Sequence, residues 1–343
     1  MKKIFITGIC GFVGSSLASF FYQKKFKVFG IDNLSRKGSY KNFINLKKRG
    51  IKIFKGDLCD NNFVRKILKK KLIINNLIHC AAYTSVLDGT NSINPRELYK
   101  NNILSTLNSL EIANNFNSNF IFISSSRVYS LKELNNIRFN IRKKYNLSKN
   151  KKNGLTSNGV REDFSINSPL SFYGSSKIIS ENMVQEYCQT KNIPFLINRC
   201  GLIAGKGQLY KNDQGIVSFW INSWKKNKKL FYIGFNGKGY QTRDCLHPND
   251  LSNLINLQFK KIKKLKNKIY NVSGGIPSSF SLYELSSWCN RNIFPKKINK
   301  INKNRKFDVK WLVLDNSNAK KEFGWKIKYK KNQIFDDILR EDD

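Results

Sequence analysis

A triplet of glycines near the N-terminus constrains the fold of this 343-residue chain more than any other feature. A short β-favouring run, residues 4–6, precedes Gly8, Gly11 and Gly14, and a helix-compatible run follows them. At this spacing Gly8 would allow a tight turn, Gly11 would let the backbone approach a pyrophosphate, and Gly14 would let the helix pack closely on the strand. The helix N-terminus would then offer free N–H groups and partial positive charge to phosphates.

The residues after this helix support the same interpretation. A second apolar run, residues 26–31, ends at Asp32, where a carboxylate would accept hydrogen bonds from an adenosine ribose. Lys2 and Lys3 before an apolar run are also compatible with a secretory signal. The order of strand, glycine triplet, helix, strand and acidic residue favours dinucleotide binding over that alternative and over a chance glycine turn.

Alternating strand and helix patterns continue through most of the first 200 residues. The expected strands are residues 51–54, 77–80, 120–123 and 194–198, and the expected helices are 61–71, 95–114 and one from about 170. This order predicts an α/β fold with a Rossmann-type, doubly wound parallel sheet that binds ligand at the carboxyl ends of its strands. We expect a dinucleotide-binding domain over 1–200, with a lysine-rich insert at 130–168 as a partly ordered lid. Residues 201–343 are expected to form a smaller, mixed C-terminal substrate lobe.

Composition narrows the classes of function. The net charge is +39, but the lysines are spread over the expected loops and helices without interleaved aromatic residues, so nucleic-acid binding is not expected as the main function. No apolar run is long enough to span a bilayer. Seven cysteines without a CxxC pair indicate reduced thiols in a cytoplasmic protein. His79 and His247 are expected to be structural or loop residues, and no metal is expected.

A tyrosine four residues before a lysine on one helix places the phenol and the ammonium on the same face. The cation would lower the pKa of the phenol and allow proton exchange near neutral pH. This spacing occurs three times, as Tyr145/Lys149, Tyr173/Lys177 and Tyr187/Lys191. Only Tyr173 begins a helix that would lie over the serines ending the strand at 120–123. Tyr145 lies in a lysine-rich loop, and Tyr187 lies at the far end of its helix.

Further motifs accompany the glycine triplet. They are DNLSRKGS at 32–39, GDL at 56–58, HCAA at 79–82, SSSRVYS at 124–130, YGSSK at 173–177 and QTRDCLHPNDL at 241–251. Together they resemble the extended short-chain dehydrogenase/reductases, the NAD-dependent nucleotide-sugar epimerases and dehydratases, over nearly the whole chain. The resemblance implies NAD as the cofactor, a nucleotide-diphosphate sugar as the substrate, and a homodimer or homotetramer paired through the helices beginning near Pro95 and Ser171. Asp32 favours NAD over NADP because a 2′-phosphate would meet its charge.

The resemblance implies a role for individual residues. The hydroxyl residue of the family lies four before the tyrosine of the VY pair, which selects Ser125 over Ser124 and Ser126. Ser125 would bind the reacting sugar hydroxyl, and Tyr173 would be the acid/base. Lys177 would lower the pKa of Tyr173 and would bind the nicotinamide ribose. The expected cofactor-binding residues are Gly8, Gly11, Phe12, Val13, Gly14, Asp32, Asn33, Asp57, Leu58, Ala81, Ala82, Asn102, Tyr173 and Lys177. The expected substrate-binding residues are Ser126, Arg127, Asn198 and Arg243, with Arg243 gripping nucleotide phosphate.

The residues after Ser125 distinguish the reactions of the family. Dehydratases that eliminate water carry Asp-Glu there, whereas this chain carries Ser126 and Arg127, so epimerisation through a transient ketosugar is expected. SSSRVYS, the insert, NRCGLIAGKGQ at 198–208 and YIGFNGKGYQTRD at 232–244 are most similar to the CDP-paratose (CDP-tyvelose) 2-epimerase branch, which implies a CDP-sugar. The alternatives are a nucleotide-sugar reductase or dehydrogenase, a 4,6-dehydratase-like enzyme and a non-enzymatic RNA-binding relative. The base, the sugar and the reacting carbon stay open.

Overall fold

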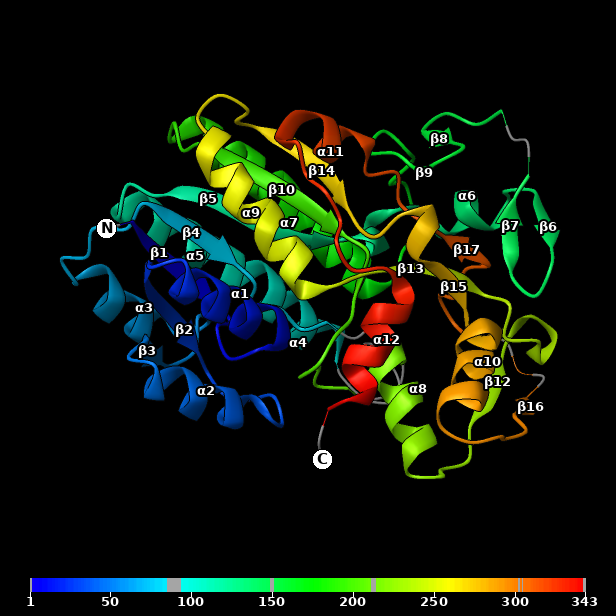
Figure 1. The fold of residues 1–343 in the computed structure, drawn as a ribbon. Coiled ribbons are helices and arrows are strands. Elements are labelled where there is room, and N and C mark those ends of the chain that lie inside the picture. Colours follow the sequence, from blue (N-terminus) through cyan, green and yellow to red (C-terminus); the bar gives the residue numbers. More distant parts are fainter. Residues whose placement is uncertain are drawn as a thin grey trace. The chain divides into compact units, whose positions relative to one another are not determined.

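The computed structural model describes residues 2–84, 94–148, 151–210, 214–301, 303 and 305–341 (Figure 1). It divides into two compact units, each assembled from separate stretches of the chain. The first unit comprises Met1–Ser125, Phe172–Arg199 and Pro248–Tyr270, and the second comprises Ser126–Ser171, Cys200–His247 and Asn271–Asp343. These groups differ from the contiguous 1–200 and 201–343 expected from the sequence, because the insert groups with the second unit and Pro248–Tyr270 with the first.

The first unit is built on a seven-stranded sheet with the order β14-β10-β5-β4-β1-β2-β3. The strands are β1 (Lys3–Thr7), β2 (Lys27–Asp32), β3 (Lys52–Lys55), β4 (Asn76–His79), β5 (Asn119–Ser125), β10 (Phe195–Cys200) and β14 (Lys268–Val272). The pairs β1–β2, β1–β4, β2–β3 and β4–β5 are parallel. In this register Ile6 of β1 pairs with Gly30 of β2 on one side and with Ile78 of β4 on the other. The expected doubly wound parallel sheet is confirmed, and the N-terminal segment that was also compatible with a secretory signal forms strand β1 and helix α1.

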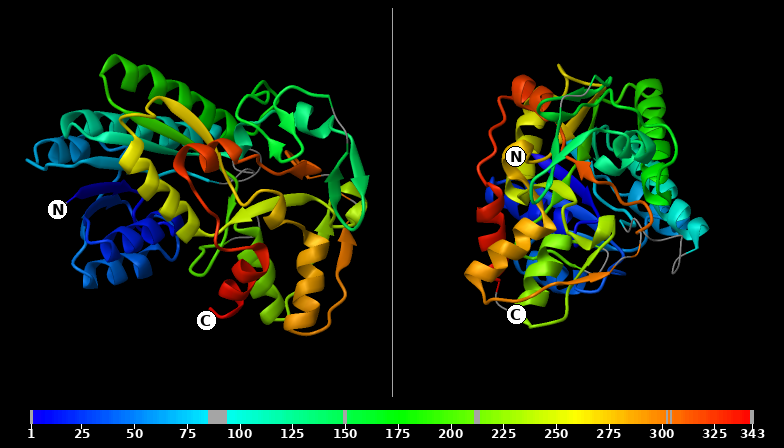
Figure 2. Two further views of the ribbon diagram at one scale, coloured as in Figure 1. Left: turned by 45° about the horizontal axis from the view of Figure 1, so that its top comes forward. Right: turned by 90° about the vertical axis from the view of Figure 1, so that its right-hand side faces the viewer.

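Helices cover both faces of this sheet (Figures 1 and 2). They are α1 (Phe12–Gln23), α2 (Ser39–Lys48), α3 (Asn61–Leu68), α4 (Pro95–Tyr99), α5 (Ser105–Asn115), α7 (Phe172–Thr190) and α9 (Pro248–Lys261). Helix α1 contacts α2 and α9, whereas α5 contacts α3 and α7, so the helices form two layers. Phe5 and Phe120 of the strands pack with Leu110 of α5 and Val184 of α7 in one core cluster. Burial on both faces explains the near-continuous apolar runs of the strands.

The helix expected over 95–114 contains a π-helical turn. Helix α4 begins with Pro95, and the side chain of Asn94 caps it by accepting from Arg96 N at 3.0 Å. The π-helix η1 (Lys100–Leu104) then joins α4 to α5. Such turns are rare and occur mostly as single interruptions of α-helices, frequently at functional sites. Asn102, one of the expected cofactor-binding residues, lies in this turn.

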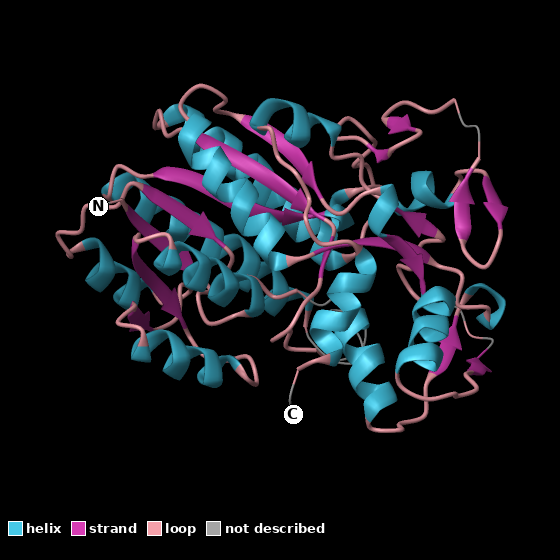
Figure 3. Ribbon diagram, viewed as in Figure 1, coloured by secondary structure: helices cyan, strands magenta, loops and turns pink. Residues whose placement is uncertain are grey.

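The second unit consists of short strands and helices (Figure 3). They are η2 (Ser126–Val128), α6 (Leu131–Asn135), β6 (Phe139–Ile141), β7 (Tyr145–Leu147), β8 (Leu155–Thr156), β9 (Gly159–Val160), β11 (Leu202–Ile203), α8 (Ile216–Lys225), β12 (Phe231–Ile233), η3 (Phe235–Gly237), β13 (Thr242–Leu246), η4 (Ile276–Ser278), β15 (Ser279–Ser281), α10 (Leu282–Asn292), β16 (Asn299–Ile301), β17 (Trp311–Leu312), α11 (Ser317–Phe323) and α12 (Lys331–Leu339). Strand β13 pairs in parallel with β11 and β17 and antiparallel with β15, so the expected mixed character is confirmed. Trp224, Trp288 and Phe335 from α8, α10 and α12 belong to its core cluster.

The insert at 130–168 contains helix α6 and two antiparallel hairpins, β6–β7 and β8–β9. The first hairpin lies against β13, because Tyr145 N donates to Tyr240 O at 3.1 Å and Thr242 Oγ1 donates to Tyr145 O at 2.9 Å. The insert is therefore packed on the second unit wherever it is described, and its function as a lid stays a prediction.

Two properties bear on the environment of the chain. Among the residues that the structure describes, no helix is both long enough and apolar enough to cross a membrane. None of the seven cysteines, all of which are described, is in a disulfide, and five of them are buried.

Candidate active site

The loop between β1 and α1 has the geometry that the glycine triplet predicts. Gly8 has a φ of +65°, and a Cβ added to Gly14 would lie 2.1 Å from Gly8 O. A Cβ added to Gly11 would meet the same oxygen at 3.2 Å. Helix α1 begins at Phe12 without a side-chain cap or an acidic residue in its first turn. Its first N–H groups are therefore suited to an anionic ligand.

A pocket with about 700 Å³ of empty space, part of it open to solvent, adjoins this loop at the ends of β1 to β4. The expected residues that line it are Gly8, Gly11, Asp32, Asn33, Asp57, Leu58, Ala81 and Ala82. Phe12, Val13 and Gly14 lie instead in the first turn of α1. The pocket is also lined by residues that were not expected from the sequence, among them Arg36, Cys59, Tyr83 and Asn101. Arg36 lies within the motif DNLSRKGS, in the loop after the strand that ends at Asp32, and this position could have predicted that it lines the pocket.

Backbone groups hold the carboxylate of Asp32 at the end of β2. Cys10 N donates to Oδ2 and Leu34 N donates to Oδ1, each at 2.8 Å. Burial raises the pKa of Asp32, and hydrogen bonds from Leu34, Cys10 and Gly11 oppose that increase. A carboxylate has about four lone-pair sites, so Asp32 retains capacity for a ribose hydroxyl.

Asp57 is held in a similar way at the end of β3. Cys59 N donates to Oδ1 at 2.7 Å, and Asn33 Nδ2 donates to Oδ2 at 3.0 Å. The side chain of Asn33 therefore joins the loop after β2 to the loop after β3. Leu58 is 5% exposed and belongs to the core cluster beneath the pocket.

The expected catalytic residues come from two neighbouring elements, β5 and α7. Ser125 ends β5, whereas Tyr173 and Lys177 lie one turn apart near the start of α7, 7% and 3% exposed. Lys177 Nζ donates to Ile123 O at 3.0 Å and lies 4.6 Å from the centre of the Phe122 ring. Lys177 therefore fixes the first turns of α7 to the strand end that carries Ser125.

The other two tyrosines have different surroundings. Tyr145 lies in strand β7, and Lys149 lies outside the described residues. Tyr187 lies near the end of α7, where burial raises its pKa and Glu111 and Cys188 add to the increase. A raised pKa favours the protonated phenol, so Tyr187 is poorly suited to accept a proton near neutral pH.

Asn102 lies behind the pocket wall rather than in its lining. Its Oδ1 accepts from Tyr83 N at 2.7 Å, and its Nδ2 donates to Tyr83 O at 3.1 Å and to Ser176 Oγ at 2.9 Å. The side chain is 2% exposed. Asn102 thus joins the loop that carries Ala81 and Ala82 to helix α7.

His79 is a buried structural residue at the end of β4. Its Nδ1 lies 2.7 Å from Thr7 Oγ1 and 2.9 Å from Ser109 Oγ, and its Nε2 lies 3.2 Å from Thr106 Oγ1. Burial lowers its pKa well below the usual value, and the charge of Lys177 adds to this effect. The ring is therefore neutral at physiological pH. In the described ranges, no group of three or more His, Cys, Asp or Glu side chains is arranged to bind a metal ion.

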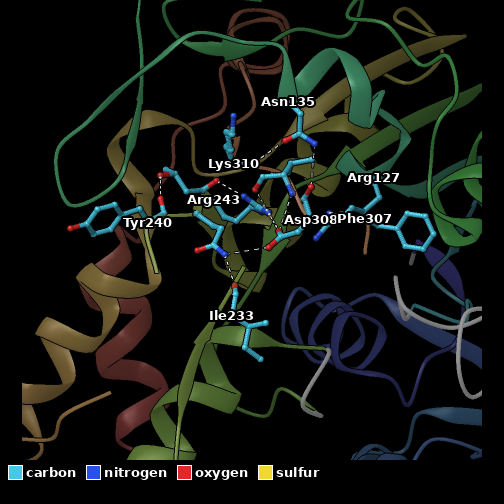
Figure 4. Close-up of polar contacts among 11 residues, drawn as sticks. Arg127, Asn135, Ile233, Tyr240, Arg243, Phe307, Asp308 and Lys310 are labelled. Atoms are coloured by element: carbon cyan, nitrogen blue, oxygen red, sulfur yellow. Dashed lines mark hydrogen bonds and ion pairs between the residues drawn. The ribbon is translucent and has the colours of Figure 1, made fainter. Parts of the chain in front are cut away.

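In the second unit, Arg243 belongs to a group of polar side chains with Arg127, Gln241 and Asp308, which we call the Arg243 cluster (Figure 4). Arg243 Nη2 donates to Asp308 Oδ1 and to Val309 O, both at 2.9 Å. Burial lowers the pKa of Arg243, and Asp308 opposes this effect. Arg243 and Asp308 side chains retain 16% and 14% exposure, so the guanidinium stays partly accessible.

The rest of this cluster surrounds the Arg243–Asp308 pair. Arg127 Nη1 donates to Phe307 O at 3.3 Å, and Gln241 Nε2 donates to Ile233 O at 2.8 Å and to Asp308 Oδ2 at 3.3 Å. Gln241 Oε1 is buried and has no hydrogen-bond partner among the described residues. The cluster thus contains two guanidinium groups and one unsatisfied acceptor.

The remaining expected substrate-binding residues have mixed surroundings. Ser126 is 9% exposed in η2 of the second unit. Asn198, in β10 of the first unit, is fully buried and exchanges two hydrogen bonds, of 2.9 and 2.8 Å, with Gln258 of α9. That reciprocal pair gives Asn198 a structural role, and its contact with a substrate stays a prediction.

This chain is similar in sequence to a known family and to characterised enzymes. The model of the NAD dependent epimerase/dehydratase family matches residues 4–273. A CDP-paratose 2-epimerase from Salmonella typhi is 31% identical over 300 residues, which cover 84% of this chain and 85% of the relative. A dTDP-D-glucose 4,6-dehydratase from Dictyostelium discoideum is 32% identical over 267 residues, covering 76% of this chain and 56% of the relative.

The solved structures agree on the fold. UDP-glucuronic acid 4-epimerase from Bacillus cereus, in complex with UDP-glucuronic acid and NAD, superposes with a TM-score of 0.78 at 23% identity and covers 99% of this chain and 97% of that chain. The glycine loop, the pocket at four strand ends and the family match over most of the sequence lead to one assignment. This chain belongs to the NAD dependent epimerase/dehydratase family, and its cofactor is NAD.

Proposed function

We propose that this protein is a nucleotide-sugar epimerase that acts on a CDP-sugar through transient oxidation and reduction of one sugar carbon. The similarity to the CDP-paratose 2-epimerase of Salmonella typhi supports the CDP-sugar. The similarity to a 4,6-dehydratase makes elimination of water the main competing reaction.

The residues of the first unit fit NAD. A Cβ at Gly14 would collide with Gly8 O, so this loop keeps its backbone and the helix N-terminus close together, as a pyrophosphate site requires. Asp32 offers a carboxylate to an adenosine ribose, and Leu58 offers an apolar side chain beside the pocket. When bound, NAD supplies the hydride acceptor for oxidation of the sugar and the hydride donor for the return step.

The side chains of β5 and α7 supply the proton chemistry. The phenolate of Tyr173 accepts the proton of a sugar hydroxyl as that carbon is oxidised, and it returns the proton when the carbon is reduced on the opposite face. The ammonium of Lys177 favours the phenolate, and the hydroxyl of Ser125 hydrogen-bonds the reacting oxygen. Tyr173 therefore ends each turnover in the protonation state in which it began.

One observation carries the choice of epimerisation over dehydration. Elimination of water needs an acid and a base at the sugar, and the two residues after Ser125 are Ser126 and Arg127, neither of which has a carboxyl group. Ser126 is a buried hydroxyl, and Arg127 is bonded to Phe307 O. In the second unit, Arg243 donates from Nη1 to Thr242 O and from Nη2 to Asp308 Oδ1 and Val309 O, and the partly accessible N–H groups that these bonds leave open are suited to a nucleotide diphosphate.

The test is turnover of a panel of CDP-, UDP-, GDP- and dTDP-sugars by the purified protein without added cofactor. We expect an isomeric sugar nucleotide from a CDP-sugar, identified by NMR, with no net change in reduced cofactor. Net formation or consumption of NADH would favour a reductase or dehydrogenase, and a keto-deoxy product would favour a dehydratase. Salt-sensitive RNA binding without turnover of any sugar would favour the non-enzymatic alternative.

We also propose a homodimer or homotetramer paired through α5 and α7, and a cytoplasmic location. The support for pairing is the family resemblance, and the support for the location is that all seven cysteines are free thiols. Sedimentation of the purified protein measures the assembly, and a monomer at micromolar concentration would contradict it.

A further inference from the structure

A fully buried ion pair joins helix α7 to strand β10 behind the expected catalytic residues. Arg199 Nη2 donates to Glu181 Oε2 at 2.7 Å, and Arg199 Nε lies 3.1 Å from both carboxylate oxygens. Glu181 is 1% exposed and Arg199 is 3% exposed. The mechanism proposed above uses neither residue.

Glu181 also bonds to the strand that carries Ser125. Ser124 Oγ donates to Glu181 Oε1 at 2.5 Å, and Ser124 is 3% exposed. One turn earlier on α7, Lys177 Nζ donates to Ile123 O. Two consecutive residues of β5, directly before Ser125, are therefore bonded to two side chains spaced one turn apart on α7.

This arrangement determines how α7 lies along the end of β5. The bond from Lys177 fixes one point of α7 against β5, and the bond at Glu181 fixes a second point one turn later, so the two together define the polar register between helix and strand. Arg199 in turn fixes the orientation of the Glu181 carboxylate, because Nε and Nη2 of the planar guanidinium both donate to it. Ser125 lies on one of the two joined elements and Tyr173 on the other, so their approach depends on this junction.

Stability alone is a weak reason for such a pair. Desolvation of two charges offsets most of their attraction, and replacement of a buried ion pair by apolar residues of similar volume is often neutral or stabilising. An apolar pair at 181 and 199 would fill the same space. It would leave Ser124 without its acceptor at the strand end that carries the reacting hydroxyl.

We propose that Glu181, held by Arg199, is a positioning residue that sets the approach of the Ser125 hydroxyl to the Tyr173 phenol. This inference rests on the proposed function, because it assigns the effect to the step in which Ser125 and Tyr173 act together. Glu181 acts through Ser124 and the backbone of β5 and does not itself touch the substrate.

The test compares Ser124→Ala with the control Ser118→Ala in NAD-loaded protein. Ser118 precedes the other end of the same strand, is 2% exposed and donates one hydrogen bond, to Ile74 O at 2.9 Å. Each variant thus loses one buried serine hydrogen bond next to β5. We expect kcat to fall about tenfold in Ser124→Ala with KM unchanged, and to stay at the wild-type value in Ser118→Ala, because small misplacements of reacting groups reduce turnover strongly.

The double variant Glu181→Leu/Arg199→Met separates positioning from folding. We expect it to keep the thermal stability and NAD content of the wild type and to lose about tenfold or more in kcat. The single variant Glu181→Gln keeps an acceptor for Ser124 but removes the negative charge that faces Arg199. It should therefore lose more stability than the double variant and less kcat.

Amide hydrogen exchange at residues 123–125 of NAD-loaded protein gives a second readout that needs no substrate. We expect faster exchange in Ser124→Ala and in the double variant than in Ser118→Ala. Wild-type kcat and wild-type exchange in Ser124→Ala would overturn the inference, whatever the stability of the double variant. A wild-type protein that epimerises no sugar would instead overturn the proposed function, and the exchange comparison would still decide the role of Glu181.

Discussion

The pocket that we propose for NAD in the first unit and the Arg243 cluster of the second unit are defined by different kinds of interaction. The pocket depends on backbone geometry: Gly8 has a positive φ, Gly14 leaves no room for a Cβ, and backbone N–H groups hold Asp32. The Arg243 cluster depends on side chains distant in sequence, because Arg243 is held by Asp308, 65 residues later.

The difference has a consequence for how each region tolerates change. A site set by backbone turns should tolerate most side-chain substitutions near it but fail when a glycine gains a Cβ. A site set by paired side chains should respond to the loss of either partner while the fold persists.

The largest effect is expected from Tyr173→Phe. The variant lacks the group that accepts the proton, so we expect turnover to fall about 10³-fold while NAD stays bound. Tyr187→Phe, on the same helix, is the matched control and should retain wild-type turnover. Steady-state kinetics with the CDP-sugar and the cofactor content of the purified protein are the measurements. An active Tyr173→Phe variant would remove α7 from the catalytic assignment.

Gly14→Ala should be the next most damaging change, because its Cβ would lie 2.1 Å from the Gly8 carbonyl oxygen, which belongs to the backbone and cannot rotate away. We expect a loss of about 2–3 kcal/mol of stability and of bound NAD. Gly11→Ala, whose Cβ would meet the same oxygen at 3.2 Å, should fold normally and lose only part of the NAD affinity. Thermal unfolding with and without NAD compares them, and equal effects would contradict a backbone-defined pocket.

Arg243→Lys tests the side-chain-defined region. A lysine keeps the charge but not the two-donor fork, so we expect KM for the nucleotide sugar to rise about tenfold with kcat and NAD content unchanged. Asp308→Asn, which removes the charge that holds Arg243 at 2.9 Å, should raise KM in the same direction by less. Reduced NAD binding in either variant would show that the two regions are not independent.

The smallest effect on activity is expected from Asp244→Asn. Burial raises the pKa of Asp244 to about 6 from the usual 3.8. Between these values the folded state binds more protons than the unfolded state, so this carboxyl lowers stability as the pH rises from about 4 to about 6. Asp244→Asn should therefore not show the loss of stability with rising pH that Asp244 causes. It should keep the loss that Asp32 causes. Melting temperatures across this pH range measure the difference, and parallel curves for the two proteins would contradict it.

Much of the first unit was predictable because its determinants are local in sequence. The apolar runs predicted the strands β1 to β5 and β10, and the glycine triplet and Asp32 predicted a loop and a strand end that line the pocket. Strand β14 and helix α9 were missed, because they return to the first unit only after a long segment of the second. A short apolar run does not indicate which sheet it will join.

The contacts between distant side chains were the other part that the sequence did not predict. Nothing in the sequence pairs Asp308 with Arg243, or Glu181 with Arg199 and Ser124, because such contacts arise from tertiary packing rather than from spacing. The reciprocal pair of Asn198 and Gln258 is a further example: it gives Asn198 a structural role that the sequence did not predict, and the contact of Asn198 with a substrate stays a prediction.

The π-helical turn at Lys100–Leu104 puts the two parts of its helix out of phase. An α-helix advances about 100° per residue, so one surplus residue in a turn offsets every later side chain by about that angle. A helical wheel drawn through from Pro95 would therefore assign wrong faces after Leu104. Removing one residue there would restore a regular helix. It would also turn Asn102 away from Tyr83 and Ser176, and the pocket wall would lose the hydrogen bonds that join it to helix α7.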